Sequence, residues 1–191
     1  MPEGPEVKRT AEGLARALTN KTIKNVEILS GRYLKEDPTG IEEFRASLPI
    51  KVVGAGCHGK FIFALCSNES YIWSTLGMTG YWNSEGGKYA RIRLDLSDGS
   101  KVFFNDMRNF GTMKFVKGKH EMVKKLKSLG PDMLAEDVST HKFKTALQTK
   151  PEWSIAKALM KQTLVCGVGN YITADSLWLA KISPKRKIKD I

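Results

Sequence analysis

The chain has 191 residues, of which 41% are hydrophobic and 27% are charged. This length allows one large domain or two small ones, and the composition excludes an intrinsically disordered or low-complexity chain. The 31 Lys and Arg residues exceed the 20 Asp and Glu residues, so the formal net charge is +11. This excess favours a polyanionic partner such as nucleic acid or an anionic membrane, and a merely solvated basic face is the alternative.

The positive charge lies mainly in the second half of the chain. Residues 1–110 carry 15 basic and 13 acidic side chains, whereas residues 111–191 carry 16 basic and 7 acidic ones. The three cysteines form no CxxC pair, so we expect neither a disulfide framework nor a zinc site, and no metal or other cofactor. There is no apolar run of membrane-span length and no signal-peptide pattern, so we expect a soluble intracellular protein with no membrane partner.

The first predicted element is an amphipathic helix over residues 5–18, because its apolar side chains recur at helical spacing. Residues 22–116 instead contain short runs rich in β-branched and aromatic residues, which predict strands; they include residues 50–53, 61–65, 71–73 and 102–104. Polar and apolar residues alternate up to Leu96, and Asp98-Gly99 follows, which predicts an antiparallel hairpin.

Helical patterns return after Lys117. We expect helices over residues 119–129, 139–148, 154–162 and 171–180, with breaks at Gly130-Pro131-Asp132 and at Pro151. The predicted fold class is therefore α+β. An N-terminal helix and an antiparallel β-sandwich occupy residues 1–120, and a helical domain occupies residues 121–191.

A glycine turn precedes the last predicted helix. Gly167 and Gly169 can adopt positive φ, and Asn170 is the expected N-cap of the helix over residues 171–180. Free amides at this helix end, with nearby basic residues such as Lys157 and Lys161, would suit a phosphate. A plain helical hairpin is the alternative.

The N-terminus carries the first candidate for chemistry. Removal of Met1 before the small residue Pro2 would leave a secondary amine. An α-amino group titrates near pH 8 rather than at the roughly 10.4 of lysine, so more of it is a neutral nucleophile at working pH, and its adduct with an aldehyde carbon is a charged iminium ion. Glu3 and Glu6 could move protons beside it, although acidic residues also favour the first turn of a helix.

Six motifs occur in a defined order along nearly the whole chain. They are Pro2-Glu3-Gly4-Pro5-Glu6, Gly59-Lys60, Leu76-Gly77-Met78-Thr79-Gly80, Asp106-Met107-Arg108-Asn109-Phe110-Gly111, Leu129-Gly130-Pro131-Asp132 and Gly167-Val168-Gly169-Asn170. Their order and spacing resemble the formamidopyrimidine-DNA glycosylase/endonuclease VIII family, and Gly4 is similar to the endonuclease VIII branch.

The resemblance implies a monomeric base-excision repair enzyme, with damaged double-stranded DNA as partner in the cleft between a β-sandwich domain and a helix–two-turn–helix domain. It would be a DNA glycosylase with apurinic/apyrimidinic (AP) lyase activity. Oxidised bases, pyrimidines favoured, would be removed through a Schiff base on Pro2, and the strand would then be cleaved by β-elimination or β,δ-elimination. It would lie in the nucleus of a eukaryote or the cytoplasm of a bacterium.

The same resemblance assigns roles to ten residues. Pro2 would be the nucleophile, Glu3 the proton donor, Glu6 a supporting carboxylate, and Lys60 a cation at the lesion phosphate that assists β-elimination. The DNA-binding residues would be Met78, Arg108 and Phe110, which fill the void left by an extruded base, together with Tyr89, Lys150 and Asn170.

The sequence departs from the family at its end. Relatives continue into a β-hairpin finger with an arginine that assists δ-elimination, and no such hairpin is expected between Lys185 and Ile191. A DNA or abasic-site binder with little catalysis is therefore the alternative. An N-terminal-proline tautomerase is a third possibility, and Pro2 is its only support.

Overall fold

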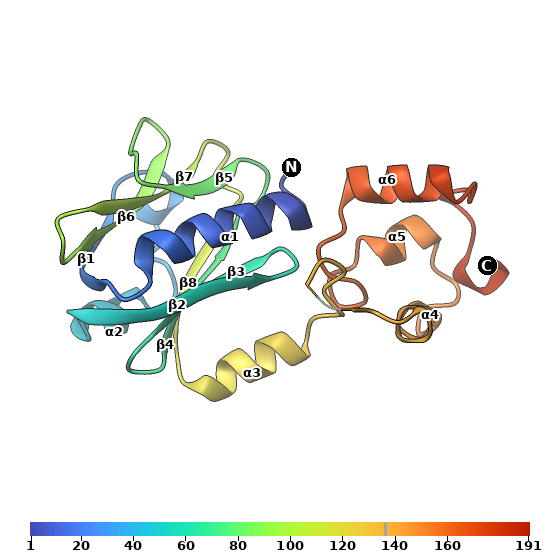
Figure 1. Cartoon of the computed structure of the whole chain (residues 1–191). Coiled ribbons are helices and arrows are strands. Elements are labelled where there is room, and N and C mark those ends of the chain that lie inside the picture. The colour runs from blue at the N-terminus through green and yellow to red at the C-terminus, as the bar shows by residue number, and fades with distance from the viewer. Residues whose placement is uncertain (136) are drawn as a thin grey trace. The chain divides into compact units, whose positions relative to one another are not determined.

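The computed structural model describes residues 1–135 and 137–191. Its helices are α1 (Gly4–Leu18), α2 (Ile41–Ala46), α3 (Lys119–Lys127), α4 (Thr140–Gln148), α5 (Ile155–Leu159) and α6 (Asn170–Leu179), with short 3-10 helices η1 (Gly31–Leu34) and η2 (Ile188–Asp190) (Figure 1). Its strands are β1 (Thr22–Ile28), β2 (Ile50–His58), β3 (Phe61–Cys66), β4 (Ser70–Thr75), β5 (Gly80–Asn83), β6 (Ala90–Leu96), β7 (Lys101–Asp106) and β8 (Thr112–Lys117).

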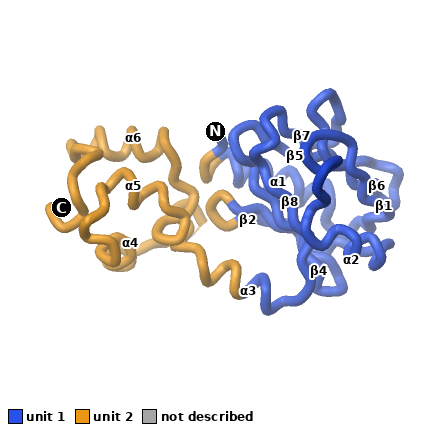
Figure 2. Tube along the Cα trace, turned by 180° about the vertical axis from the view of Figure 1, so that it is seen from behind, with its two compact units in different colours: residues 1–2, 6–57, 61–123 blue, residues 3–5, 58–60, 124–191 orange. Residues whose placement is uncertain are grey.

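The chain divides into two compact units (Figure 2). Unit 1 consists of residues 1–2, 6–57 and 61–123, and unit 2 consists of residues 3–5, 58–60 and 124–191. Two short segments from the first third of the chain therefore belong to the unit that holds α4, α5 and α6. One of them contains Glu3 and the other contains Lys60.

Unit 1 is built on antiparallel strands in the order β5-β7-β6-β1-β2-β3-β4-β8. The predicted hairpin is confirmed: β6 pairs with β7 across a turn in which Gly99 has a φ of +83° and the Asp98 carboxylate accepts the Ser100 amide. The apolar stripe of α1, including Val7 and Leu18, packs into the core formed by the strands. The predicted α+β class, with an N-terminal helix, an antiparallel β-sandwich and later helices, is confirmed.

Unit 2 has its own core. Leu147 of α4, Ile155 and Leu159 of α5, and Leu177 of α6 pack together with Ile188 near the end of the chain. The predicted helices are present: α4 and α5 each begin one residue later than predicted, and α6 begins and ends one residue earlier. Ser139 and Ser154, which were predicted to begin two of these helices, are instead the N-cap residues of α4 and α5. The hydroxyl of each serine accepts the backbone amide of the residue three positions further on.

The predicted helix over residues 154–162 was too long, because α5 ends at Leu159. The chain turns there: the amides of Leu164 and Val165 both donate to the Lys161 carbonyl, which leads the backbone towards Gly167. No helix in the described part of the chain is both long and apolar enough to cross a membrane.

Candidate functional site

The Glu3 carboxylate occupies the amino end of α6. Its side chain is only 1% exposed, and its oxygens accept the amides of Gly169 at 2.7 Å, Tyr171 at 3.0 Å and Ile172 at 3.3 Å. The first amides of a helix have no partner within the helix, and the helix dipole favours negative charge at that end. Glu3 therefore acts as the N-terminal cap of a helix that begins 167 residues later in the sequence.

This arrangement corrects the prediction for Asn170. The N-cap residue is Gly169, which makes no side-chain cap, and Asn170 is the first residue of α6 with an exposed side chain. The helix amides that were expected to suit a phosphate donate instead to Glu3. The prediction of Asn170 as N-cap used only the residues next to the helix. Such a local pattern cannot reveal a cap that a residue from the other end of the chain supplies.

Gly169 lies where no side chain fits. A Cβ added there would collide with the Lys60 ammonium group and with the Glu3 carboxylate. The adjoining backbone is equally close, since the Gly4 amide donates to the Gly167 carbonyl at 2.7 Å. Unit 2 therefore brings an acidic and a basic side chain together against a glycine at the start of α6.

The turn that carries Lys60 is held by a second buried carboxylate. The Gly59 amide donates to Asp132 Oδ2 at 2.7 Å, and His58 Nε2 lies 2.8 Å from the Gly130 carbonyl oxygen. Gly59 has a φ of +56°, a conformation that only glycine adopts readily. The motif that the sequence suggested as a helix breaker at Gly130-Pro131-Asp132 thus also fixes the turn before Lys60, whose side chain is half-buried.

The other two predicted catalytic residues lie near the beginning of the chain. Pro2 is partly exposed and immediately precedes the buried Glu3. Glu6 is exposed in the first turn of α1. Glu3 thus has a fixed position, while Glu6 faces solvent.

In unit 1 three predicted DNA-binding side chains project from two loops. Met78 follows β4, and Arg108 and Phe110 follow β7. All three are exposed, Phe110 by 59%, and Arg108 Nη1 lies 3.4 Å from Met78 Sδ. The structure therefore brings two apolar side chains and one cation together on two neighbouring loops.

Asp106 holds these two loops together and was missed as a functional residue. It is fully buried, and its carboxylate accepts the Gly111 amide at 2.7 Å, the Arg108 amide at 3.2 Å and the Thr79 hydroxyl. The buried Arg91 guanidinium donates to the Asp106 carbonyl at 2.7 Å. An acidic residue between a strand and a glycine-containing loop was the available signal in the sequence.

Tyr89 and Lys150 lie in different units. Tyr89 precedes β6 in unit 1, and its ring lies 5.7 Å from Lys88 Nζ, while its carbonyl accepts the Asp106 amide. Lys150 follows α4 in unit 2, is exposed, and places its ammonium 5.6 Å from the Trp153 ring centre. Tyr89 is thus linked through its backbone to the loop network of unit 1.

Some of the basic charge near the end of the chain is neutralised locally. Lys187 Nζ and Lys189 Nζ lie 2.8 Å and 2.7 Å from the Glu152 carboxylate. Hydrogen bonds from these two ammonium groups lower the pKa of Glu152 to about 2, and the bond from Lys187 has the larger effect. These two lysines are therefore paired within unit 2, unlike a freely solvated basic run.

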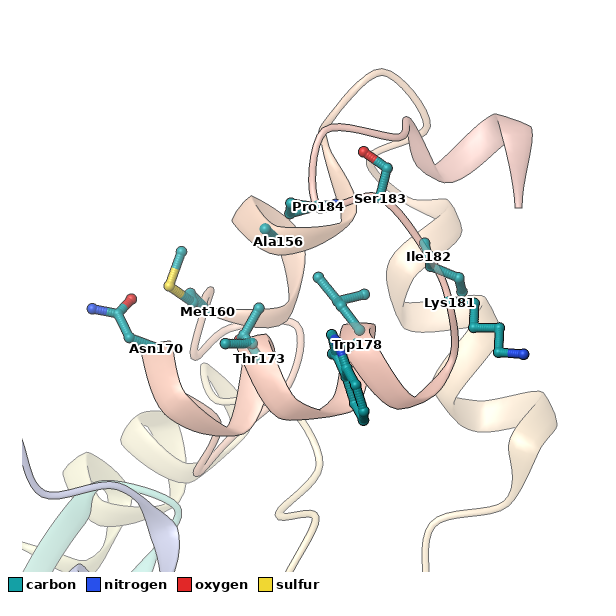
Figure 3. A pocket seen from close by; sticks show the side chains of 11 residues that line it. Ala156, Met160, Asn170, Thr173, Trp178, Lys181, Ile182, Ser183 and Pro184 are labelled. Carbon is teal, nitrogen blue, oxygen red and sulfur yellow. The ribbon is translucent and has the colours of Figure 1, made fainter.

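A pocket of about 680 Å³ lies beside Asn170, between α5, α6 and residues 181–184 (Figure 3). Most of its lining is apolar, with Met160 at the Asn170 end and Trp178 towards Lys181. Lys181 is the one titratable side chain in the described lining. The described lining of this pocket therefore offers apolar contact surface and a single cation.

Comparison with known proteins identifies related sequences over both units. Residues 1–113 match the family described as the formamidopyrimidine-DNA glycosylase N-terminal domain, and residues 129–191 match its H2TH domain. Formamidopyrimidine-DNA glycosylase of Streptococcus pneumoniae serotype 4 is 34% identical over 193 residues, covering 97% of this chain and 69% of that protein. The enzyme of Lactiplantibacillus plantarum is 30% identical, with the same two coverages.

Solved structures of related proteins also match this chain over nearly its whole length. Formamidopyrimidine-DNA glycosylase of Lactococcus lactis, bound non-covalently to DNA with an AP site, matches with a TM-score of 0.84 and 25% identity, over 99% of this chain and 74% of that chain. A MutM complex with DNA that contains carbocyclic 8-oxo-G matches with a TM-score of 0.85 and 26% identity, over 100% and 73%. The Lactococcus lactis protein bound to DNA containing an oxidised pyrimidine matches with a TM-score of 0.84 and 25% identity, over 100% of this chain and 72% of that chain.

We predict that Gly169→Ala destabilises unit 2 by about 1–3 kcal/mol, because the new methyl group must displace Lys60 or the buried Glu3 carboxylate. Urea denaturation measures the change in the free energy of unfolding. Gly87→Ala is the matched control, since a Cβ there meets no described atom within 4 Å, and it should change stability by less than about 0.5 kcal/mol. Equal stability of the two variants would contradict the crowded site.

Proposed function

The chain belongs to the formamidopyrimidine-DNA glycosylase family, and from this membership we propose that it excises an oxidised base from duplex DNA and then cleaves the strand at the resulting abasic site. The observation that carries the proposal is the Glu3 carboxylate, which is fixed to α6 one residue after Pro2 and beside Lys60. Pro2 would thus provide an amine nucleophile, the adjacent Glu3 an acid–base group, and the turn at Gly59-Lys60 a cation.

In the proposed reaction Pro2, exposed as a secondary amine when Met1 is removed, attacks C1′ of the damaged nucleotide. The bond from C1′ to the base breaks, and the base leaves with a proton taken from solvent. The N–H proton of the attacking amine passes to the Glu3 carboxylate, and Glu3 returns it to the ring oxygen as the bond from C1′ to that oxygen breaks, which leaves a cationic iminium ion between Pro2 and C1′. The anchoring of Glu3 supports this role, because a carboxylate held by three amides keeps a constant position next to the nucleophile.

Strand cleavage follows as a β-elimination. A proton leaves C2′, the electrons of that C–H bond form the C2′–C3′ double bond, and the C3′–O bond breaks so that the 3′ phosphate departs. Lys60 would stabilise the negative charge of the departing phosphate. We propose this β-elimination as the step that cleaves the strand.

The loops of unit 1 would replace the extruded nucleotide. A damaged base inside a duplex must leave the stack before it can react, which costs a few kcal/mol. Met78 and Phe110 would fill the vacated space, and Arg108 would supply positive charge to the unpaired partner strand. Their exposure on loops held by the buried Asp106 supports this proposal.

For the lesion we propose oxidised pyrimidines as favoured substrates, on the similarity of Gly4 to the endonuclease VIII branch. Solved relatives bind DNA that contains 8-oxo-G and DNA that contains an oxidised pyrimidine, and the curated relatives named above are formamidopyrimidine-DNA glycosylases. Membership of the endonuclease VIII branch, and with it the preference for oxidised pyrimidines, therefore stays a prediction. The tautomerase alternative has no support beyond Pro2 in a chain of this family.

We expect borohydride to trap the chain covalently on duplex DNA with an AP site, since reduction of the iminium ion leaves a stable amine. Mass spectrometry of the tryptic digest should locate the adduct on residues 2–8. Pro2→Gly should reduce trapping about tenfold or more, and Lys60→Met should still form the adduct. An adduct on a lysine would overturn the role of Pro2, and tight duplex binding without any adduct would favour the DNA-binder alternative.

We expect Phe110→Ala to slow strand cleavage at an AP site in duplex DNA by about tenfold, because stacking by one aromatic side chain contributes about 1–3 kcal/mol. Single-turnover cleavage assays measure the rate on duplex and on single-stranded DNA. The single-stranded rate should change little, since no stacked void forms there. Leu34→Ala, at another exposed apolar residue of unit 1, is the matched control, and an equal loss on both substrates would contradict the void-filling role.

A further inference from the structure

The described part of the chain contains three buried carboxylates, and the proposed function leaves Asp132 without a part in the reaction. Glu3 serves as the acid–base group, and Asp106 holds the loops of unit 1. Asp132 is 3% exposed. A charged group is rarely buried unless its hydrogen bonds are satisfied, and its contacts therefore indicate what it stabilises.

Asp132 joins two distant segments of unit 2. Its Oδ2 accepts the Gly59 amide at 2.7 Å, and its Oδ1 accepts the Leu134 amide at 3.0 Å. The backbone on either side is fixed as well, because the Cys166 amide donates to the Pro131 carbonyl at 2.9 Å. The carboxylate thus stands on a rigid segment when it binds Gly59.

Gly59 is confined from a second direction. A Cβ at Gly59 would lie 2.6 Å from the Cys166 Cβ and 2.7 Å from the Gly167 amide nitrogen. The α-carbon therefore packs directly on the backbone that leads to α6, while the amide is bound to Asp132. Together these two constraints leave the turn at residues 58–60 little freedom to rotate or shift.

The side chain that follows this turn reaches the chemical centre of unit 2. Lys60 Nζ lies against Gly169, at the point where the Glu3 carboxylate also contacts the backbone. A rotation at Gly59 would move the ammonium group of the next residue by several times the local displacement. The position of Lys60 thus depends on the hydrogen bond between Gly59 and Asp132.

We propose that Asp132 is a positioning residue for strand cleavage, which holds the Gly59-Lys60 turn so that the Lys60 ammonium stays at the start of α6. The inference rests on the proposed function, in which Lys60 assists β-elimination. Asp132 itself contacts backbone amides and acts through Lys60. A misplacement of about 1 Å in a catalytic group can lower a rate by up to about a hundredfold.

The test uses Asp132→Asn, which preserves the size of the side chain but replaces one acceptor oxygen by a donor that cannot bind an amide N–H. Asp175→Asn, an exposed change on α6, is the matched control. Hydrogen exchange of residues 58–60 reports on the turn without requiring activity. We expect exchange at Gly59 to rise at least tenfold in Asp132→Asn and to stay unchanged in Asp175→Asn.

The second readout is single-turnover β-elimination, compared with borohydride trapping. Asp132→Asn and Lys60→Met should each slow strand cleavage about tenfold, while trapping by Pro2 persists. The double variant should lose no more than either single variant, because both act through the same ammonium group. A merely structural role would instead lower trapping and cleavage together and add to the effect of Lys60→Met.

The outcomes separate this inference from the proposed function. Unchanged exchange at Gly59, full cleavage activity in Asp132→Asn, or additive losses in the double variant would each overturn the positioning role. If the wild-type chain neither traps nor cleaves AP-site DNA, the proposed function fails, and Asp132 loses its part in strand cleavage with it. Hydrogen exchange would then still show whether the turn depends on this carboxylate.

Discussion

Each carboxylate buried in the described part of the chain must find backbone N–H groups, and this requirement organises the candidate site. Charge away from water is costly unless hydrogen bonds replace those lost to solvent. Glu3 meets the requirement at the start of α6, Asp132 at the Gly59 amide, and Asp106 in the loop after β7, where it also accepts the Thr79 hydroxyl from the loop after β4. Pro2 immediately precedes Glu3, and Lys60 immediately follows the Gly59 amide that Asp132 binds. The three void-filling residues lie on the two loops that Asp106 joins; they are Met78, Arg108 and Phe110. The polar interior of the protein is therefore also the support of its proposed chemistry.

Glycines complete the same arrangement. A carboxylate that binds several amides requires the backbone to approach closely, and a Cβ would then occupy the space of another group. At Gly169 that group is the pair of Lys60 and Glu3, and at Gly59 it is the backbone before α6. Glycine-containing motifs and buried acids are thus two parts of one local structure, and a change in either displaces the other.

Much of the fold could be predicted because it follows from local patterns. The stripe of α1, the turn at Asp98-Gly99 and the capping serines before α4 and α5 each depend on residues within one or two turns of the chain. The cap of α6 could not be predicted, because Glu3 and Gly169 are separated by 166 residues. For the same reason Asn170 was wrongly expected to be the cap, and Asp132 was interpreted only as part of a helix break.

The Glu3 carboxylate holds the beginning of the chain at α6 and thereby fixes the residue next to the proposed nucleophile. Hydrogen exchange at Gly169, Tyr171 and Ile172 in Glu3→Gln measures this anchoring, with Glu12→Gln on the exposed face of α1 as control. We expect exchange at these amides to rise at least tenfold in Glu3→Gln and to stay unchanged in Glu12→Gln. Amides that remain equally protected in Glu3→Gln would show that Glu3 does not hold the start of α6.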